Sequence, residues 1–201
     1  MGNRQKGHST PAWELDAISN LVGIPRNQLD RIYRDFKRVS KDYLLNKYEF
    51  RRIYKDMLKY SPSNDNRSDN RMNNAFADKI FNTFDQDRSG RLTFDEFISA
   101  YVMLQNKINP QTRLNFVLDH YSHNNGYITP NMGRRLVQDM SNLYNINTDP
   151  MQVWRSLETN DMINGRIPQE AFVNYFLQHP AYSAALYNGI QVPLPPPSPI
   201  L

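Results

Sequence analysis

Residues 85–96, near the middle of the chain, carry oxygen-bearing side chains at regular spacing. Asp85, Asp87 and Ser89 occupy the first, third and fifth places, and Glu96 occupies the twelfth. Calcium is a hard cation that takes about six to eight oxygen ligands, so carboxylate, hydroxyl and carbonyl oxygens at this spacing suit it. The segment therefore predicts a calcium site.

The remaining places complete the pattern of an EF-hand calcium loop. Arg91, at the seventh place, would offer its backbone carbonyl, and Thr93, at the ninth, would act through a water. Gly90 permits the positive φ that turns the chain around the ion. Three ionised carboxylates predict a dissociation constant of about 10⁻⁷ to 10⁻⁵ M. The predicted metal ligands are Asp85, Asp87, Ser89, Arg91, Thr93 and Glu96.

Helices must position this loop, and the sequence predicts them by periodicity. Thr93 and Glu96 form a capping box, which marks the start of the helix that leaves the loop. Apolar residues recur at spacings of three and four along most of the chain, as on one face of an amphipathic helix. The clearest stripes cover residues 29–36, 50–57, 76–84, 97–104, 114–118, 136–143 and 172–176.

The predicted helices come in pairs joined by four similar loops. The last three loops have glycine at the sixth place, and all four have an aliphatic residue at the eighth. This internal repeat predicts an all-α fold of four EF-hand helix–loop–helix units in two paired lobes. Short two-stranded pairings should join the eighth-place residues within each lobe. The loops are 38–49, 85–96, 121–132 and 160–171, and the eighth-place residues are Leu45, Leu92, Ile128 and Ile167.

Three of the four loops lack the ligands that calcium needs. The first has Arg38 at its first ligand place and Tyr43 where glycine belongs, although Glu49 remains at the twelfth. A cation at the first place should repel calcium. In the third and fourth loops, residues without carboxylates stand at ligand places, namely Tyr121, Met132, Met162 and Ala171. We therefore expect one calcium site in a frame of four units.

These features predict a simple domain organisation. An N-terminal segment, 1–27, precedes a first EF-hand pair over 28–106, which contains a polar linker at 61–74. A second pair covers 107–180, and a proline-rich tail follows at 181–201. Thr129 and Pro130 should start one helix of the second pair, and Pro168 should open another.

Composition restricts the function classes. The chain has 201 residues, 39% of them hydrophobic, and no cysteine, which excludes disulfides and thiolate zinc sites. The net charge is +4, and residues 26–59 carry eleven Lys or Arg against five Asp or Glu. This basic region could meet acidic lipids, an acidic partner or nucleic acid, or could simply be a solvated surface. Without an apolar run of membrane-spanning or signal-peptide length, we expect a cytoplasmic protein.

At its motifs the chain resembles the neuronal calcium sensor branch of EF-hand proteins, which includes recoverin-like and potassium-channel-interacting proteins. The resemblance covers about residues 25–180 and is carried by residues 29–36, 50–54, 81–85 and 126–129. Calcineurin B-like regulatory subunits are similar as well. The chain departs from the sensor branch in two ways. Ser40 and Lys41 replace the usual Cys-Pro pair of the first loop, and the third loop, which usually binds calcium, lacks ligands.

The resemblance implies a regulatory protein that binds a target helix in a hydrophobic groove between the first two hands. The target would be an amphipathic helix of a channel, a receptor or an enzyme. The alternative is a constitutive, calcium-independent subunit in which calcium is only structural. The candidate groove residues, each of which could equally be ordinary core, are Phe36, Tyr54, Phe81, Phe97, Tyr101 and Met103.

Both termini carry short motifs. Gly2 invites N-myristoylation, although Lys6 stands where the motif prefers Ser or Thr. One acyl chain binds membranes only marginally, so the basic N-terminal region could add the second signal for peripheral membrane contact. The tail contains overlapping PxxP patterns at 193–196 and 196–199, which suit an SH3-type domain, an unstructured tail or a segment folded back over the groove.

An enzymatic function is not expected. The sequence has no phosphate-binding loop, no HExxH and no Gly-x-Ser-x-Gly, and its four histidines are too scattered to predict a metal site. Nucleic-acid binding would rest on charge alone, because no recognised module is present. The sequence leaves the oligomeric state open.

Overall fold

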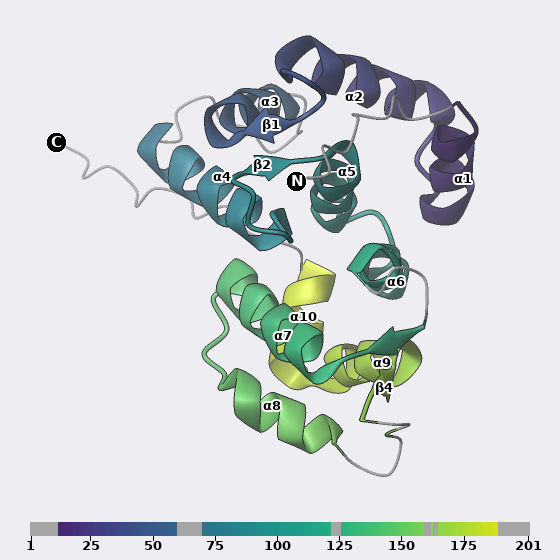
Figure 1. Ribbon diagram of the computed structural model, residues 1–201, viewed down its shortest axis with the longest axis vertical. Helices are drawn as coiled ribbons and strands as arrows, with labels where there is room; N and C mark the ends of the chain where they lie inside the picture. Colours follow the sequence, from purple (N-terminus) through teal and green to yellow (C-terminus); the bar gives the residue numbers. More distant parts are fainter. Residues whose placement is uncertain (1–11, 60–69, 122–125, 159–161, 163–164, 189–201) are drawn as a thin grey trace, which may run out of the picture.

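The computed structural model describes residues 12–59, 70–121, 126–158, 162 and 165–188. Within these residues the chain is helical with two short antiparallel strand pairs, which confirms the predicted all-α fold (Figure 1). No helix among them is long and apolar enough to cross a membrane. In chain order, the elements are α1 (Ala12–Val22), α2 (Arg26–Val39), β1 (Leu45–Asn46), α3 (Lys47–Lys59), α4 (Asn70–Phe84), β2 (Arg91–Leu92), α5 (Phe94–Met103), α6 (Pro110–Tyr121), β3 (Tyr127–Ile128), α7 (Pro130–Tyr144), α8 (Pro150–Leu157), β4 (Ile167–Pro168), α9 (Gln169–Gln178) and α10 (Pro180–Asn188).

The first two loops pair through β1 and β2. Leu45 lies opposite Leu92, as the eighth-place pattern predicts, and both side chains are fully buried. Helices α2 to α5 surround this pair with aromatic rings whose centroids lie 5.2–6.3 Å apart. The core thus holds both ends of loop 85–96, since its rings flank the loop on α4 and α5. These rings are Phe36, Phe50, Phe81, Phe94 and Phe97.

The third and fourth loops pair in the same way through β3 and β4. Ile128 lies opposite Ile167, and both are fully buried. Thr129 is the N-cap of α7, and its hydroxyl accepts a hydrogen bond from the Met132 N–H at 3.4 Å. Pro168 occupies the cap position of α9. The fold of this pair therefore persists although its loops lack calcium ligands.

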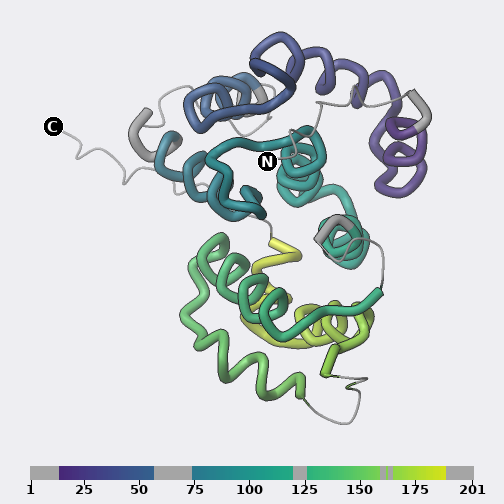
Figure 2. Tube along the Cα trace, viewed as in Figure 1, coloured from purple at the N-terminus to yellow at the C-terminus, as the bar shows by residue number. Residues whose placement is uncertain are grey.

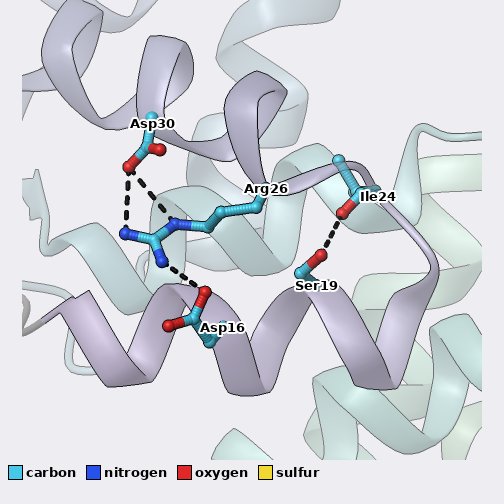
Figure 3. Close-up of polar contacts among 5 residues, drawn as sticks. All are labelled: Asp16, Ser19, Ile24, Arg26 and Asp30. Carbon is cyan, nitrogen blue, oxygen red and sulfur yellow. Dashed lines mark hydrogen bonds and ion pairs between the residues drawn. The ribbon is translucent and has the colours of Figure 1, made fainter.

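A helix that the sequence analysis does not predict, α1, lies within the N-terminal segment. It packs against α2 and α6, with Leu15 buried at 2% exposure. Figure 3 shows how its end is fixed: Arg26 of α2 pairs with Asp16 and Asp30, and the Ser19 hydroxyl donates to the Ile24 carbonyl at 2.7 Å. The apolar spacing of residues 15, 18 and 22 was the signal available for this helix.

Two predicted boundaries need correction. Helix α4 begins at Asn70, so it includes the last part of the predicted linker 61–74, where Arg and Met favour helix; the rest of the linker, 61–69, lies outside the described residues. Residues 181–188 are not tail but part of α10. Tyr182 and Leu186, four residues apart, are fully buried on one face of that helix, which explains why it folds back onto α9.

The two EF-hand pairs lie against each other. Helix α4 packs against α7, α5 packs against α6, and α1 joins α2 to α6. In Figure 2 the purple and blue first half of the chain lies above the green and yellow second half. Loop 85–96 follows α4, so it starts close to the junction with α7. The other limits of the predicted domains stay a prediction.

Candidate calcium site

Three carboxylates of loop 85–96 converge in space. Ligand oxygens of Asp85, Asp87 and Glu96 all lie within 4.8 Å of one another. Asp85 and Glu96 are each 8% exposed, whereas Asp87 is open to solvent. Calcium–oxygen distances are about 2.3–2.6 Å, so one ion between these groups could contact all three. In the part of the chain that the structure describes, no second group of three such side chains is found.

Glu96 connects the two ends of the loop. Its Oε1 accepts a hydrogen bond from the Gln86 N–H and its Oε2 accepts one from the Thr93 N–H, both at 2.9 Å. The Thr93 hydroxyl accepts the Glu96 N–H at 3.3 Å, which completes the predicted capping box at the start of α5. The carboxylate is thus fixed by the first turn of α5 while it faces the beginning of the loop.

The other predicted ligands lie beside these carboxylates. Asp85 Oδ1 accepts the Ser89 N–H, and Oδ2 accepts the Gly90 N–H, both at 3.0 Å. The Ser89 hydroxyl donates to the Arg91 carbonyl at 2.8 Å, so two predicted ligand oxygens are adjacent. The Thr93 hydroxyl lies 3.0 Å from Glu96 Oε2. The use of all six residues as calcium ligands stays a prediction.

The backbone of the loop turns sharply at Gly90. Its φ is +74°, in the left-handed region that the sixth place was predicted to need. A Cβ added at Gly90 would meet no atom within 4 Å, so glycine is required by conformation rather than by space. Arg88 also has a positive φ, +56°, which costs a non-glycine residue some strain.

The environment affects two of the carboxyl groups differently. Burial raises the pKa of Glu96, and hydrogen bonds from the N–H groups of Thr93 and Gln86 offset only part of this effect. For Asp87, the partial loss of solvent also acts to raise the pKa, but hydrogen bonds within the loop, among them the one from the Ser89 N–H at 3.0 Å, outweigh it and the pKa is lowered. A nearby cation would favour the ionised form of both groups.

The first loop uses its retained carboxylate for structure. Glu49 Oε2 accepts the Asn46 N–H at 2.9 Å, and Asn46 Oδ1 accepts the Glu49 N–H at 3.0 Å. Tyr43 adopts the glycine conformation with a φ of +60°. Arg38, at the first ligand place, pairs with Asp35 at 3.0 Å. The two hydrogen bonds between Asn46 and Glu49 hold the turn from β1 into α3, whereas the Arg38–Asp35 pair lies within α2.

The third and fourth loops are described only in part. Met132 and Ala171, at their closing ligand places, are partly buried against the core. Met162 is partly buried there too. These side chains pack rather than offer oxygen. Residues 122–125, 159–161 and 163–164 lie outside the described residues, as does the side chain of Tyr121.

The residues predicted to line a target groove form core in this structure. Each is 8% exposed or less. Helix α5 is the most enclosed element of the first pair, with nine of its ten residues buried. A role for these side chains in target binding stays a prediction. The six residues are Phe36, Tyr54, Phe81, Phe97, Tyr101 and Met103.

One residue at the loop was missed by the sequence analysis. Arg135, on α7 of the second pair, donates to the backbone carbonyls of Asp85, at 3.0 Å, and of Gln86. It also faces Asp139, with Nε 3.6 Å from Oδ2. A contact spanning 50 residues leaves no local spacing signal, so only the packing of α4 on α7 identifies it.

Comparisons with known proteins agree with the geometry. Residues 47–104, from α3 to the end of α5, match the model of an EF-hand domain pair. Over 132 residues the chain is 24% identical to calcium-binding protein NCSA of Dictyostelium discoideum. This alignment covers 65% of the chain and 63% of that protein, so the chain spans less than two thirds of its relative. Both findings support a calcium-binding EF-hand family.

The predicted cofactor follows from three concordant observations. The loop has EF-hand spacing, its three carboxylates converge, and the matched region contains it. Oxygen ligands with several carboxylates favour calcium over softer metals. The findings therefore support Ca²⁺ as the ion of this protein.

Proposed function

We propose that this protein is a calcium-responsive regulatory protein of the neuronal calcium sensor type, with a single site at loop 85–96. The observation that carries the proposal is the convergence of Asp85, Asp87 and Glu96 within 4.8 Å. The EF-hand match points to a calcium-binding protein rather than to an enzyme. The three loops without ligands support a single site.

The proposed response uses the placement of the ligands on different elements. Asp85 directly follows α4, whereas Glu96 lies in the first turn of α5. The positive charge of bound calcium would balance the negative charges of these two carboxylates. Because Glu96 cannot move without the helix that fixes its capping box, occupancy of the loop is linked to the angle between α4 and α5.

The apolar surface for a target would come from the aromatic core next to α5. Phe97 of α5 lies 5.3 Å from Phe36 and 6.3 Å from Phe50, measured between ring centroids. A rotation of α5 would separate these rings and expose apolar area, which favours binding of an amphipathic helix. We propose a helix of a channel, receptor or enzyme as the target.

Glu96→Gln tests the site directly. It removes one charge at the closing ligand while keeping the size of the side chain. Changes to residues that only support a metal ligand cost about 10–100-fold in affinity, so we expect at least about 100-fold weaker calcium binding by calorimetry. Asp95→Asn removes an exposed neighbouring charge and should leave affinity nearly unchanged. Equal affinity of Glu96→Gln and the parent contradicts the proposal.

A constitutive regulatory subunit is the second candidate. It is favoured by the second pair, where Ile128 and Ile167 maintain the loop pairing without any carboxylate at the closing places. In that case calcium would only stabilise the first pair. Capture of a bound target with calcium and with chelator separates the two functions, since equal recovery supports the constitutive subunit.

We also propose a cytoplasmic location with peripheral membrane contact. Arg31, Arg34 and Arg38 are exposed at spacings of three and four along α2, which supports attraction to acidic lipid headgroups. Gly2, the proposed acylation position, lies outside the described residues. Sedimentation with phosphatidylserine vesicles should decrease when these three arginines are changed to Gln; an unchanged bound fraction contradicts this proposal.

A further inference from the structure

The second EF-hand pair contacts the calcium loop through Arg135. Arg135 extends from α7, in the middle of that helix, to the Asp85 and Gln86 carbonyls at the start of the loop. These are backbone oxygens of the first two loop residues, one of them a predicted ligand residue. The second pair therefore forms part of the environment of the loop, although it supplies no ligand to it.

This contact has the chemistry of a strong helix cap. The Asp85 carbonyl immediately follows α4, where the last carbonyls lack partners within the helix and the helix dipole is negative. A guanidinium can donate to two carbonyls at once from a rigid planar group. Asp139, one turn further along α7, faces Arg135 at 3.6 Å and balances its charge. The first loop residues are thus fixed by charge-assisted hydrogen bonds.

Helix α7 is in turn joined tightly to the core of its own pair. Gly133, two residues before Arg135, lies directly beneath the ring of Trp154 on α8, where an added Cβ would be 1.9 Å from a ring carbon. Trp154 is 1% exposed. A displacement of α7 relative to α8 therefore changes the surroundings of this indole, because so close a contact leaves no free space.

From these contacts we infer that Arg135 is a positioning residue that couples occupancy of loop 85–96 to the placement of α7 and the second pair. The inference rests on the proposed calcium site. Linkage makes the coupling reciprocal: if calcium changes how α7 sits on the loop, then weakening the α7 contact must change the affinity for calcium. The pair without ligands would then respond to calcium through Arg135.

Trp154 provides the measurement. The chain has two tryptophans, so Trp13→Phe leaves Trp154 as the sole indole reporter. In this background we expect calcium to change Trp154 emission. Arg135→Gln should abolish most of that change and weaken calcium binding about fivefold or more by calorimetry. Arg134→Gln, which removes a neighbouring cation of the same helix, should preserve both, because Arg134 contacts Asn131 rather than the loop.

Additional variants identify the source of each effect. Arg135→Lys keeps the charge but not the planar pair of donors, so its Trp154 response should be intermediate; it also serves if Arg135→Gln does not fold. Glu96→Gln should remove the response, showing that it originates in the loop. Two results would overturn this inference while leaving the proposed calcium site intact. One is calcium binding without a change in Trp154 emission, and the other is an Arg135→Gln emission response equal to that of Arg134→Gln. A parent protein that gives no calcium heat overturns the proposed site as well.

Discussion

Asp139 lies in an environment that disfavours its charge. Burial raises its pKa to about 6, and the cations Arg135 and Arg88 offset only part of this effect. Its side chain is 18% exposed and lies among residues that line a polar cavity between α4 and α7. The ionised carboxylate therefore balances Arg135 at a cost to the folded state.

The pH dependence of stability should reveal that cost. Between pH about 4 and 6 the folded protein keeps Asp139 protonated while the unfolded chain is ionised, so this group's contribution to stability decreases as pH rises through that window. The full effect of a shift from 3.8 to about 6 is at most about 3 kcal/mol. Urea unfolding in chelator should show the parent losing stability relative to Asp139→Asn over this range, with Asp95→Asn as the exposed control. Parallel curves would contradict the environment described for Asp139.

The residues of the candidate site could be predicted from the sequence inside loop 85–96 but not outside it. Asp85, Asp87 and Glu96 lie within one short segment, so their spacing alone indicates their convergence. Arg135 has no such signal, because its partners are carbonyls of a distant helix end. Every residue has the same backbone carbonyl, so a sequence pattern cannot identify which side chain donates a hydrogen bond to a given carbonyl.

At the scale of elements, the junction of α7 and α8 depends on one small residue. Gly133→Ala would place a Cβ 1.9 Å from the Trp154 ring, which forces the helices apart. Overpacking of this kind costs about 1–3 kcal/mol, more than the gain of about 1 kcal/mol in helix propensity. We expect a lower free energy of unfolding in urea, while Gln138→Ala on the exposed face of α7 stays near the parent. A Gly133→Ala protein as stable as the parent refutes this view of the junction.

Helices and strands that belong to the internal EF-hand repeat could be predicted from the sequence, and those outside the repeat could not. The partners Leu45–Leu92 and Ile128–Ile167 follow from the same place in each loop. Helices α1 and α10 belong to no repeat, and among the side chains that the structure describes each buries few apolar residues. Their folding depends on surfaces that the EF-hand pairs present, which is tertiary information.

At the scale of the whole molecule, Arg113 holds three parts of the chain together. Its side chain is 1% exposed and donates to the Met103 carbonyl at the end of α5, at 2.9 Å, and to the Leu186 carbonyl of α10. Burial lowers its pKa, which shows the cost of enclosing this charge. Two carbonyls satisfied by one guanidinium compensate for that cost.

Loss of Arg113 should therefore release α10. Arg113→Ala leaves both carbonyls without this donor, and we expect about 3 kcal/mol lower stability with faster amide exchange in α10 than in α7. Arg155→Ala, at an exposed position of α8, is the matched control and should behave like the parent. Unchanged exchange in α10 would show that the helix is held by Tyr182 and Leu186 alone.

The number of calcium ions bound by the whole chain tests the account most directly. Calorimetric titration of calcium into the chelator-treated chain of 201 residues should give one site, with the heat lost in Glu96→Gln and kept in Asp95→Asn. One site is expected because loop 85–96 combines EF-hand spacing with three converging carboxylates, whereas the other loops place Arg38, Tyr121, Met132 and Ala171 at ligand positions. Two or more sites, or heat that survives Glu96→Gln, would contradict it.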